Sequence, residues 1–463
     1  MTHTCCALSS AHGKAGIAVI RLSGDDAFEI ASKVFFPANG RKLSEIPANK
    51  AVYGSILSLD GKKIDTGIAT CFHAPFSYTG ENTVEISCHG SPVGVSAILA
   101  QLFAAGAKPA LAGEFTKRAF VNGKLDLTQA EAVAELLDAE SMSALKLSGA
   151  KLDGGLGRSI RKISDEITLI LASVYAYIDY PDEDMSDLSD GEIKEKLEDI
   201  GKKLETLKNT YSSGLAVTKG IKTVIAGLPN TGKSTFFNML SGYDRAIVTE
   251  IAGTTRDVIS ESLMLGDVKL LVSDTAGIRQ TEDKIEKIGV ERSKEALEDC
   301  ELVFALFDAS KELSDEDKEF AKEIASLGKN VIVIINKSDI AADEGGIEKM
   351  KEFFKSAGLD KICVISAEKN EGKYDVEKQV EALYNVSKEE LESGCVLTNA
   401  RQYAAVSNAK EAVDRALFAL GTLTRDAFGL DLEQALSFLC EADGRQVSET
   451  VVDSIFSHFC VGK

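Results

Sequence analysis

The sequence predicts a chain of mixed α/β and α class in three parts: an N-terminal α+β domain, a helical bundle, and an inserted Ras-like P-loop domain with a mostly parallel sheet. Three observations predict it. Short apolar runs alternate with turns in residues 1–120, apolar side chains recur at three-to-four spacing in 121–212 and 384–463, and a glycine-rich phosphate motif opens residues 217–383. Because helical patterns flank the nucleotide segment, we expect it to be inserted in one helical domain.

The composition excludes several classes of protein. The 463 residues include 52 basic and 72 acidic side chains, and a net charge of -20 excludes a protein that binds nucleic acid through an overall basic charge. Nine cysteines without a C-x-x-C pair and five histidines without ligand spacing indicate neither a zinc site nor a disulfide framework. The chain shows no secretory signal and no apolar run of roughly 18 residues, so we expect a cytoplasmic protein.

The first 120 residues carry the period-two alternation of half-buried strands. Breakers and alternation predict strands at 17–22, 65–72 and 83–88, and a helix at 92–104. Three ionisable residues, Arg21, Glu85 and Lys124, stand near the predicted turns. On composition alone, solvated surface charge is the favoured interpretation of each.

Helical signals begin at Thr128, which with Glu131 forms a capping box and predicts a helix to about Met142. Ser189 and Asn399 open later helices in the same way, and 212–214 (SSG) is expected to be a linker. A basic stretch lies between the first two helical patterns, and a solvated face is favoured over phosphate contact. It consists of Lys146, Lys151, Arg158, Arg161 and Lys162.

The phosphate motif is G-x-x-x-x-G-K-S between Gly227 and Ser234, after a short apolar strand and before a helix. Its glycines let backbone N–H groups approach phosphates, and the following helix adds its positive N-terminus. Lys233 is expected to reach the terminal phosphates and to act in catalysis, while the Ser234 hydroxyl suits Mg²⁺. The expected nucleotide contacts here are Asn230, Thr231, Gly232, Lys233, Ser234 and Thr235.

Further motifs follow at the spacing of a GTP-binding fold. Asp339 can accept both N–H groups of guanine, which adenine does not offer, and Thr255 can close on Mg²⁺ and the γ-phosphate. Glu368 replaces the lysine usual in the last base-contacting loop, which affects packing over the base. The remaining expected contacts are Asp274, Thr275, Ala276, Gly277, Asn336, Lys337, Ser338, Ser366 and Ala367.

Residues 274–277 form a D-T-A-G motif, and the next residue is Ile278. Isoleucine cannot orient an attacking water as a glutamine does in Ras-like proteins. Another group must therefore position the water. Glu282, Asp283 and Glu286 follow closely, and the residues alone leave open whether one of them acts or all are solvated acids.

Taken together, the motifs resemble those of one family, the tRNA wobble-uridine modification GTPases called MnmE or TrmE. The segments that carry the resemblance are GLPNTGKS (227–234), IAGTTRD (251–257), YTGE (78–81), GEFTKRAF (113–120), GKLDL (123–127) and the terminal FCVGK. The chain departs from the family at 11–16 (AHGKAG), at 88–91 (CHGS) and at Val461. These departures leave the geometry of the glycine-rich lead-in open.

The resemblance implies a potassium-dependent GTPase whose nucleotide domains pair in a homodimer. Asn230 matches the potassium-ligating asparagine, and the carbonyls of Thr249, Ile251 and Thr254 match the loop that completes the ion's shell. Glu286 matches the water-orienting glutamate of the family. The same loop implies nucleotide contacts from Thr249, Glu250, Ile251, Ala252, Gly253, Thr254 and Thr255.

The resemblance also implies that residues 1–120 bind a formyl- or methylene-tetrahydrofolate and form the dimer. The positions that match its folate site are Arg21, Glu85, Lys124 and Lys463. Cys460 matches a required cysteine, and two roles stay open for it, catalytic nucleophile or buried structural thiol.

The implied reaction needs an FAD-containing partner of the MnmG or GidA type. Together the two proteins add an aminomethyl or carboxymethylaminomethyl group to C5 of the wobble uridine in certain tRNAs, with GTP and Mg²⁺ at the nucleotide site. A ribosome-assembly or signalling GTPase, in which hydrolysis only times binding, is the alternative. The sequence does not say which tRNAs are substrates, how hydrolysis couples to the uridine chemistry, or the stoichiometry with the partner.

Overall fold

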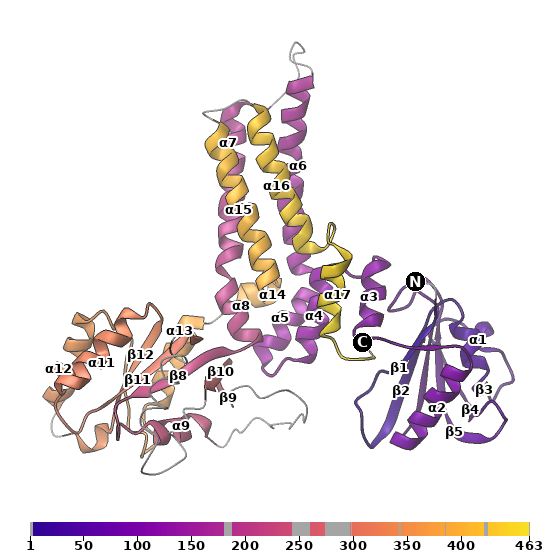
Figure 1. Ribbon diagram of the computed structural model, residues 1–463, viewed down its shortest axis with the longest axis horizontal. Helices are drawn as coiled ribbons and strands as arrows, with labels where there is room; N and C mark the ends of the chain where they lie inside the picture. The colour runs from indigo at the N-terminus through magenta and orange to yellow at the C-terminus, as the bar shows by residue number, and fades with distance from the viewer. Residues whose placement is uncertain are drawn as a thin grey trace. The chain divides into compact units, whose positions relative to one another are not determined.

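A computed structural model describes residues 3–179, 188–242, 260–273, 297, 299–341, 344–384, 386–420 and 425–462 (Figure 1). The chain divides into two compact units. The first comprises 1–137, 148–204 and 404–463, and the second comprises 138–147 and 205–403. Among the described helices, none is both long and apolar enough to cross a membrane.

The first unit begins with a seven-stranded sheet in the order β3-β4-β5-β6-β2-β1-β7. Helices α1 (Ala27–Ser32) and α2 (Pro92–Ala104) cover one face and enclose the apolar core of this domain. The strands at 65–72 and 83–88 and the helix at 92–104 that the sequence predicts are confirmed. The strands are β1 (Cys5–Leu8), β2 (Ala15–Ser23), β3 (Phe35–Pro37), β4 (Lys50–Leu57), β5 (Lys63–Phe72), β6 (Thr83–Gly90) and β7 (Lys108–Pro109).

Alternation along β2 decides which side chains reach the core. Ile20 and Leu22 are fully buried against the helices, whereas Arg21 lies between them on the opposite face. The antiparallel register of β2 and β6 places Glu85 directly opposite Arg21. Because side chains on one face of paired strands are neighbours, the two charged residues meet there.

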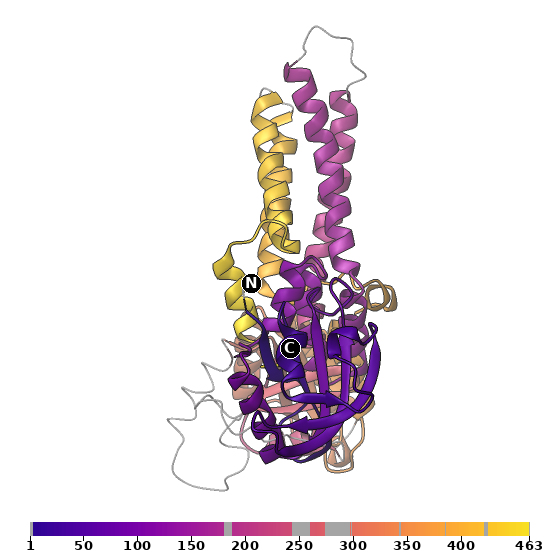
Figure 2. The same ribbon diagram turned by 90° about the vertical axis from the view of Figure 1, so that its right-hand side faces the viewer.

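The helical part of the first unit contains the long helices that the three-to-four pattern predicts. Helix α16 packs along α6, and both views show α6, α7, α15 and α16 side by side (Figure 1, Figure 2). Ile160, Ile167 and Val174 of α6 are fully buried, as a helical stripe facing a core requires. The bounds are α3 (Glu114–Val121), α4 (Leu127–Leu137), α5 (Met142–Leu152), α6 (Gly155–Asp179), α7 (Asp190–Asn209), α15 (Ala400–Leu420), α16 (Arg425–Asp443) and α17 (Glu449–Ser457).

The expected capping box at Thr128 is wrong by two residues. Asp126 caps α4 instead, because its Oδ1 accepts the backbone N–H of Gln129 at 3.0 Å while Gln129 Oε1 accepts the N–H of Asp126 at 2.9 Å. Thr128 is buried in the first turn, where its hydroxyl donates to Asp126. The helix also stops earlier than expected, at Leu137 rather than Met142.

Two further expectations are corrected. The segment 212–214 is helical, within α8 (Tyr211–Thr218), and a Cβ on Gly214 would lie 2.1 Å from the carbonyl oxygen of Leu397. That glycine therefore permits close packing rather than chain flexibility. The basic stretch is not one solvated face, because Lys151 is fully buried and bonds to Glu135 at 2.8 Å.

The second unit is built on a six-stranded sheet in the order β13-β12-β11-β8-β10-β9, parallel except for β9. Separate apolar clusters fill its two faces, so the sheet is a buried middle layer as in other parallel α/β sheets. This confirms the mostly parallel fold that the sequence predicts. The strands are β8 (Ile221–Gly227), β9 (Ser260–Leu265), β10 (Val268–Ser273), β11 (Leu302–Asp308), β12 (Asn330–Asn336) and β13 (Ile362–Val364). The helices are α9 (Lys233–Ser241), α11 (Asp315–Ser326), α12 (Glu344–Ser356), α13 (Lys373–Tyr384) and α14 (Lys388–Ser393).

Candidate functional site

The phosphate motif forms the loop between β8 and α9, at the carboxyl end of a central strand where such sheets bind ligands. Gly232 has φ of 93°, and a Cβ there would lie 2.4 Å from Nδ2 of Asn336. Asn230 also takes a left-handed conformation, with φ of 66°. Helix α9 begins at Lys233, so its unbonded N–H groups and positive end face the loop.

Lys233 folds onto the loop that precedes it. Its Nζ donates to the carbonyl oxygens of Gly227 at 2.9 Å and Leu228 at 3.0 Å. Burial lowers the pKa of the Lys233 ammonium. An anion bound in the loop would stabilise the charged form of this lysine, which favours a phosphate ligand.

One amide joins three loops. Asn336 donates from Nδ2 to the carbonyl of Thr231 at 3.0 Å, and its Oδ1 accepts the backbone N–H of Ala367 at 3.0 Å. Lys337 follows with φ of 65° and donates from Nζ to the carbonyl of Asn230 at 2.7 Å. The phosphate loop and the two expected base-contacting loops are therefore held together by side chains of the N-K-S-D segment.

Asp339 is oriented by its neighbours rather than left to rotate. Ser366 donates from Oγ to Asp339 Oδ1 at 2.8 Å, and Lys369 Nζ lies 3.9 Å from Oδ2. Lysine is absent at position 368, and Lys369, one residue later, supplies a cation here that sequence reasoning missed. A carboxylate fixed in this way can accept the paired N–H groups of guanine.

Asp308, at the end of β11, lies under this corner of the site. Its Oδ2 accepts from Lys337 Nζ at 2.7 Å, and its Oδ1 accepts from Ser310 Oγ at 2.6 Å. Burial opposes the ionisation of Asp308, but Lys337 and Ser310 outweigh it and hold the pKa of this carboxyl below its ordinary value. The ammonium of Lys337 is therefore fixed between Asp308 and the carbonyl of Asn230.

Several expected site residues lie outside the described part of the chain, so their geometry stays a prediction. They are Thr249, Glu250, Ile251, Ala252, Gly253, Thr254, Thr255, Asp274, Thr275, Ala276, Gly277, Glu286 and Lys463. Within the described residues, no group of three or more acidic, cysteine or histidine side chains could hold a metal ion.

A second candidate site lies on the face of the N-terminal sheet opposite α1 and α2. Arg21 bonds to Glu85 Oε1 through Nε at 2.8 Å and through Nη2 at 2.7 Å. The Arg21 guanidinium carbon also lies 5.3 Å from the ring centre of Tyr78 and 5.4 Å from that of Phe115. The sequence did not single out these two aromatic residues, although both fall in segments that carry the family resemblance.

Lys124 contacts the same loop as Arg21, namely residues 75–81, which join β5 to β6. Its Nζ donates to the carbonyl of Pro75 at 3.2 Å, and its side chain lies beside Gly80. The structure thus places Arg21 and Lys124 against the same loop and Glu85 beside Arg21, while a shared role in folate binding stays a prediction.

The C-terminal tail reaches the N-terminal domain. Val461 pairs with Ala112, and the carbonyl of Cys460 accepts the N–H of Gly113 at 3.3 Å. The thiol of Cys460 is exposed, so the interpretation as a buried structural cysteine is wrong. Exposure leaves the thiol accessible to reaction, although it assigns no role by itself.

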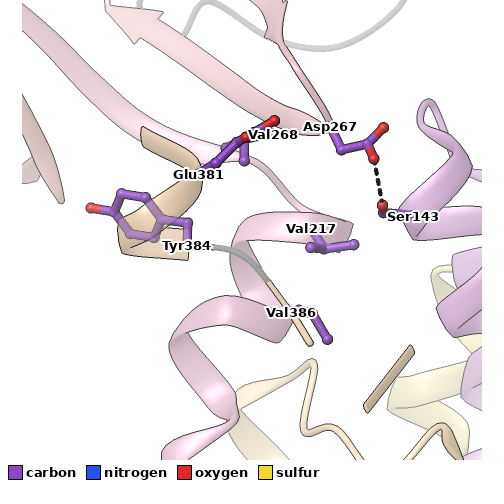
Figure 3. Close-up of a pocket in the computed structure, with 7 residues that line it drawn as sticks. All are labelled: Ser143, Val217, Asp267, Val268, Glu381, Tyr384 and Val386. Atoms are coloured by element: carbon purple, nitrogen blue, oxygen red, sulfur yellow. Dashed lines mark hydrogen bonds between the residues drawn. The ribbon is translucent and has the colours of Figure 1, made fainter. Parts of the chain in front are cut away.

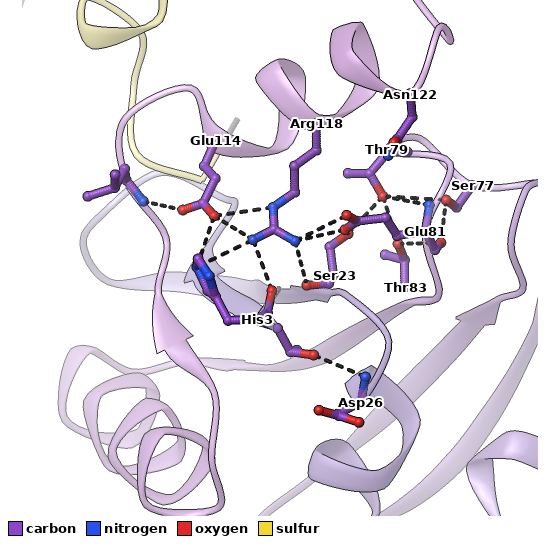
Figure 4. A network of polar contacts seen from close by, with 12 residues as sticks. His3, Ser23, Asp26, Ser77, Thr79, Glu81, Thr83, Glu114, Arg118 and Asn122 are labelled. Carbon is purple, nitrogen blue, oxygen red and sulfur yellow. Dashed lines mark hydrogen bonds and ion pairs between the residues drawn. The ribbon is translucent and has the colours of Figure 1, made fainter. Parts of the chain in front are cut away.

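A buried arginine stands at the centre of a polar network in this domain (Figure 4). Arg118 of α3 is 1% exposed and bonds to Glu81 at 2.9 Å and to Glu114 at 2.6 Å. Its Nη2 also donates to the carbonyl of His3 at 3.1 Å, and Ser23 donates from Oγ to Glu81 at 2.7 Å. Sequence reasoning treated GEFTKRAF only as a family signature and missed this role of its arginine.

Two of the cavities among the described residues have linings that share no residue with the sites just described. One, of about 90 Å³, lies in the second unit, where Asp267 accepts a hydrogen bond from Ser143 at 3.1 Å (Figure 3). The other, of about 670 Å³, lies beside α1 and β3 and is lined by Phe28, Phe36 and Arg41 among others. The candidate sites are therefore assigned from their polar chemistry and not from cavity size.

Comparisons with known proteins match both the N-terminal part of the chain and the part that follows it. A family model described as the MnmE helical domain matches residues 127–460, and one described as the GTP-binding protein TrmE N-terminus matches residues 4–124. A tRNA modification GTPase MnmE from Clostridioides difficile is 38% identical over 461 residues and covers 99% of each chain. Another, from Thermotoga petrophila, is 40% identical over 467 residues and covers 99% of this chain and 100% of that protein.

Solved structures give a partial match. A variant of Era from Aquifex aeolicus, solved with GDP and AlF4-, is 28% identical over 41% of this chain and 65% of that chain, with a TM-score of 0.27.

Proposed function

The chain belongs to the MnmE family of tRNA modification GTPases, and from this premise we propose that it is a potassium-activated enzyme of wobble-uridine modification. With an FAD-containing partner of the MnmG or GidA type, the homodimer adds an aminomethyl or carboxymethylaminomethyl group to C5 of the wobble uridine in certain tRNAs. A tetrahydrofolate supplies the one-carbon unit. This chemistry belongs to the cytoplasm, where tRNA, GTP and reduced folates are found together.

The observation that carries the proposal is the corner where Asn336 ties Thr231 of the phosphate loop to Ala367 of a base-contacting loop. Asn336 holds the phosphate loop beside the loop of Ala367. Ser366 of that same loop bonds to the carboxylate of Asp339, which supports one nucleotide that spans both. A carboxylate that pairs with guanine N–H groups discriminates against adenine by a factor of about 10⁴ or more. The reason is that adenine leaves such a carboxylate without these hydrogen-bond partners. These contacts support GTP as the nucleotide.

Hydrolysis is assigned to groups around the phosphates. Lys233 neutralises charge on the terminal phosphates, and Ser234 with Thr255 holds Mg²⁺. Glu286 orients the attacking water, since Ile278 has no polar atom to do so. Asp274 would help to hold Mg²⁺, and the N–H of Gly277 would be a donor to the γ-phosphate.

Potassium is proposed to lie beside the phosphates. Asn230 matches the potassium-ligating asparagine of the family, so its side-chain oxygen is the atom proposed as ligand. The carbonyls of Thr249, Ile251 and Thr254 complete the shell. These residues would hold a monovalent cation, which would supply the charge neutralisation that an arginine finger supplies elsewhere.

The N-terminal residues fit a folate in chemical type. A pterin offers N–H donors to Glu85, and a folate carboxylate suits the cations Lys124 and Lys463. Arg21, between two aromatic rings and one carboxylate, is rigidly placed to donate or stack. Cys460 is exposed and stands three residues before Lys463 in the sequence. We propose that its thiol acts in the modification reaction.

GTP turnover in potassium and in sodium tests the proposal. We expect turnover several-fold faster in potassium, and we expect Glu286→Ala to lower the rate while GTP affinity is kept. Equal rates in the two salts would contradict the potassium assignment. A protein that hydrolyses GTP but binds no tetrahydrofolate as the intact dimer would favour the alternative, a GTPase that times a binding event.

A further inference from the structure

The proposed folate site is assembled from separate pieces of chain that need a common support. Tyr78 lies on the loop 75–81, Lys124 follows helix α3, and Cys460 with Lys463 belongs to the tail. Arg21 and Glu85 lie in strands β2 and β6, whereas Tyr78, Lys124 and Cys460 lie outside the strands of the sheet. Without a shared anchor, the loop and the tail could move independently of the sheet.

Helix α3 touches each of these pieces. Asn122, at its C-terminal end, donates to the carbonyl of Thr79 at 2.7 Å, and Tyr78 shares a hydrogen bond of 2.9 Å with Thr116. At its other end, Glu114 accepts the backbone N–H of Leu111 at 2.8 Å and so fixes the loop 111–113. That loop pairs with the tail at Val461.

We propose that Arg118 is the positioning residue of this site, because its guanidinium binds the loop 75–81 through Glu81 and the loop 111–113 through Glu114. Figure 4 shows the guanidinium between the two carboxylates, with Glu114 on one side and Glu81 on the other. Nη1 lies 2.9 Å and 3.2 Å from the two oxygens of Glu81, while Nε and Nη2 donate to Glu114. The inference rests on the proposed folate site.

Glu81 and Glu114 each connect Arg118 to one of the two loops. Glu81 also accepts from Ser23, whose hydroxyl lies 2.7 Å from that of Thr79, so the loop is held to the end of β2. Burial opposes the ionisation of Glu114, yet hydrogen bonds from Arg118 and the N–H of Leu111 hold its pKa below the ordinary value. The network is therefore charged at neutral pH and fixes both loops at once.

Arginine is required because one group must donate in two directions. Its planar fork reaches Glu81 with Nη1 and Glu114 with Nε and Nη2, whereas a lysine ammonium is a compact point charge at the end of a flexible stem. Arg118→Lys therefore keeps the charge but loses one of the two loops. This variant therefore distinguishes a role of Arg118 in positioning the loops from a role in neutralising buried charge.

The experiment compares intact dimers of wild type, Arg118→Lys, Glu81→Gln and Ser23→Ala. The affinity for 5-formyltetrahydrofolate, the affinity for GTP, and the rate at which a maleimide labels Cys460 are measured well below the melting temperature. Arg41→Lys, on an exposed arginine of the same domain, is the matched control. Labelling of Cys395 in the other unit serves as an internal reference.

We expect Arg118→Lys to weaken folate binding about tenfold or more, since small displacements of binding groups have large effects. GTP affinity should stay within about twofold, and Cys460 labelling should change relative to Cys395 while Arg41→Lys matches wild type. A purely structural arginine would lower the melting temperature and leave the folate affinity of the folded protein unchanged.

If Arg118→Lys does not fold, Glu81→Gln and Ser23→Ala decide the question, because neither removes the buried cation. Wild-type folate affinity and wild-type labelling in all folded variants would overturn the positioning role. Absence of folate binding in wild type itself would instead overturn the proposed folate site and the inference with it.

Discussion

At the scale of single residues, the proposed specificity for guanine depends on the orientation of the Asp339 carboxylate. Ser366 Oγ and Lys369 Nζ contact its two oxygens, and Asn336 ties the neighbouring loops together. Such a carboxylate accepts two N–H groups but donates none, so it recognises guanine by its donors. The consequence can be tested by reversing the donor pattern.

We expect Asp339→Asn to change the preferred nucleotide from GTP to xanthosine triphosphate. An asparagine amide donates to the C2 carbonyl of xanthine, whereas it meets the C2 amino group of guanine with a second donor. GTP affinity should fall by about a hundredfold or more, and xanthosine triphosphate should bind tightly. Equilibrium titration with both nucleotides measures the change.

Asp360→Asn, on an exposed acid of the same unit, should bind both nucleotides as wild type does. Loss of both nucleotides by a folded Asp339→Asn protein would show that the aspartate supports the loops rather than reads the base.

We expect the stability of the protein to depend on pH through Asp308. Its pKa is held below the ordinary value of 3.8, so its contact with Lys337 stabilises the fold fully above that value and is lost as the pH falls through the lower native pKa. Asp308→Asn should lower the free energy of unfolding at pH 7 by about 1–3 kcal/mol. The difference from wild type should shrink below about pH 4.

Chemical denaturation of both proteins between pH 7 and pH 2.5 checks this. A difference that stays constant across the range would mean that Asp308 is protonated or unpaired in the native protein.

At the scale of helices and strands, regular patterns were predictable and local partners were not. The alternation in 83–88 predicts β6 because side chains of a strand face opposite sides, and the stripe from Ile160 to Val174 predicts α6. The cap at Asp126 was missed because a competing threonine two residues later fits the same motif. Gly214 was misread because its close neighbour, Leu397, is distant in sequence.

In the candidate sites too, features that are local in sequence were predictable and contacts between distant residues were not. The phosphate loop is local in sequence, so spacing alone predicted the turn and the helix that follows it. Arg118 could not be predicted as a network centre, since its partner Glu81 is 37 residues away. Lys369 was missed because the motif expects lysine one position earlier.

The buried pair of Lys151 on α5 and Glu135 on α4 tests how these two helices are fixed. Lys151→Met should destabilise the protein by about 3–5 kcal/mol, because it leaves a buried carboxylate without its ammonium partner. Lys151→Met with Glu135→Met should recover part of that loss, since apolar pairs of similar size often replace buried ion pairs. Thermal and denaturant unfolding provide the values.

The exposed pair of Lys194 and Glu198, 3.9 Å apart on α7, provides the control. Lys194→Met should change stability by less than about 0.5 kcal/mol. A double variant no more stable than Lys151→Met would show that the helices depend on the lysine for something other than this ion pair.

At the scale of the whole molecule, the two proposed ligands belong to different units. Asp339 and the phosphate loop lie in the second unit, whereas Arg21 and Glu85 lie in the first. The chain passes between the units inside helices α5, α7 and α15, each of which contributes residues to both. Coupling between two sites needs coupling evidence rather than a continuous chain alone, so a link between the proposed sites is a prediction to be measured.

If GTP binding alters the folate site, the coupling must be reciprocal. A non-hydrolysable GTP analogue that changes 5-formyltetrahydrofolate affinity by some factor must have its own affinity changed by the same factor when folate is saturating, because the two paths form one thermodynamic cycle. We expect a factor of about 5–150, the usual range for coupled sites. Equilibrium titrations of each ligand, with and without the other and in potassium, give both numbers. Arg41→Lys should keep the factor, while Arg118→Lys should bring it toward one, since a folate loop released from α3 no longer responds to the helices. A factor of one in the wild-type protein would mean that the two sites act independently.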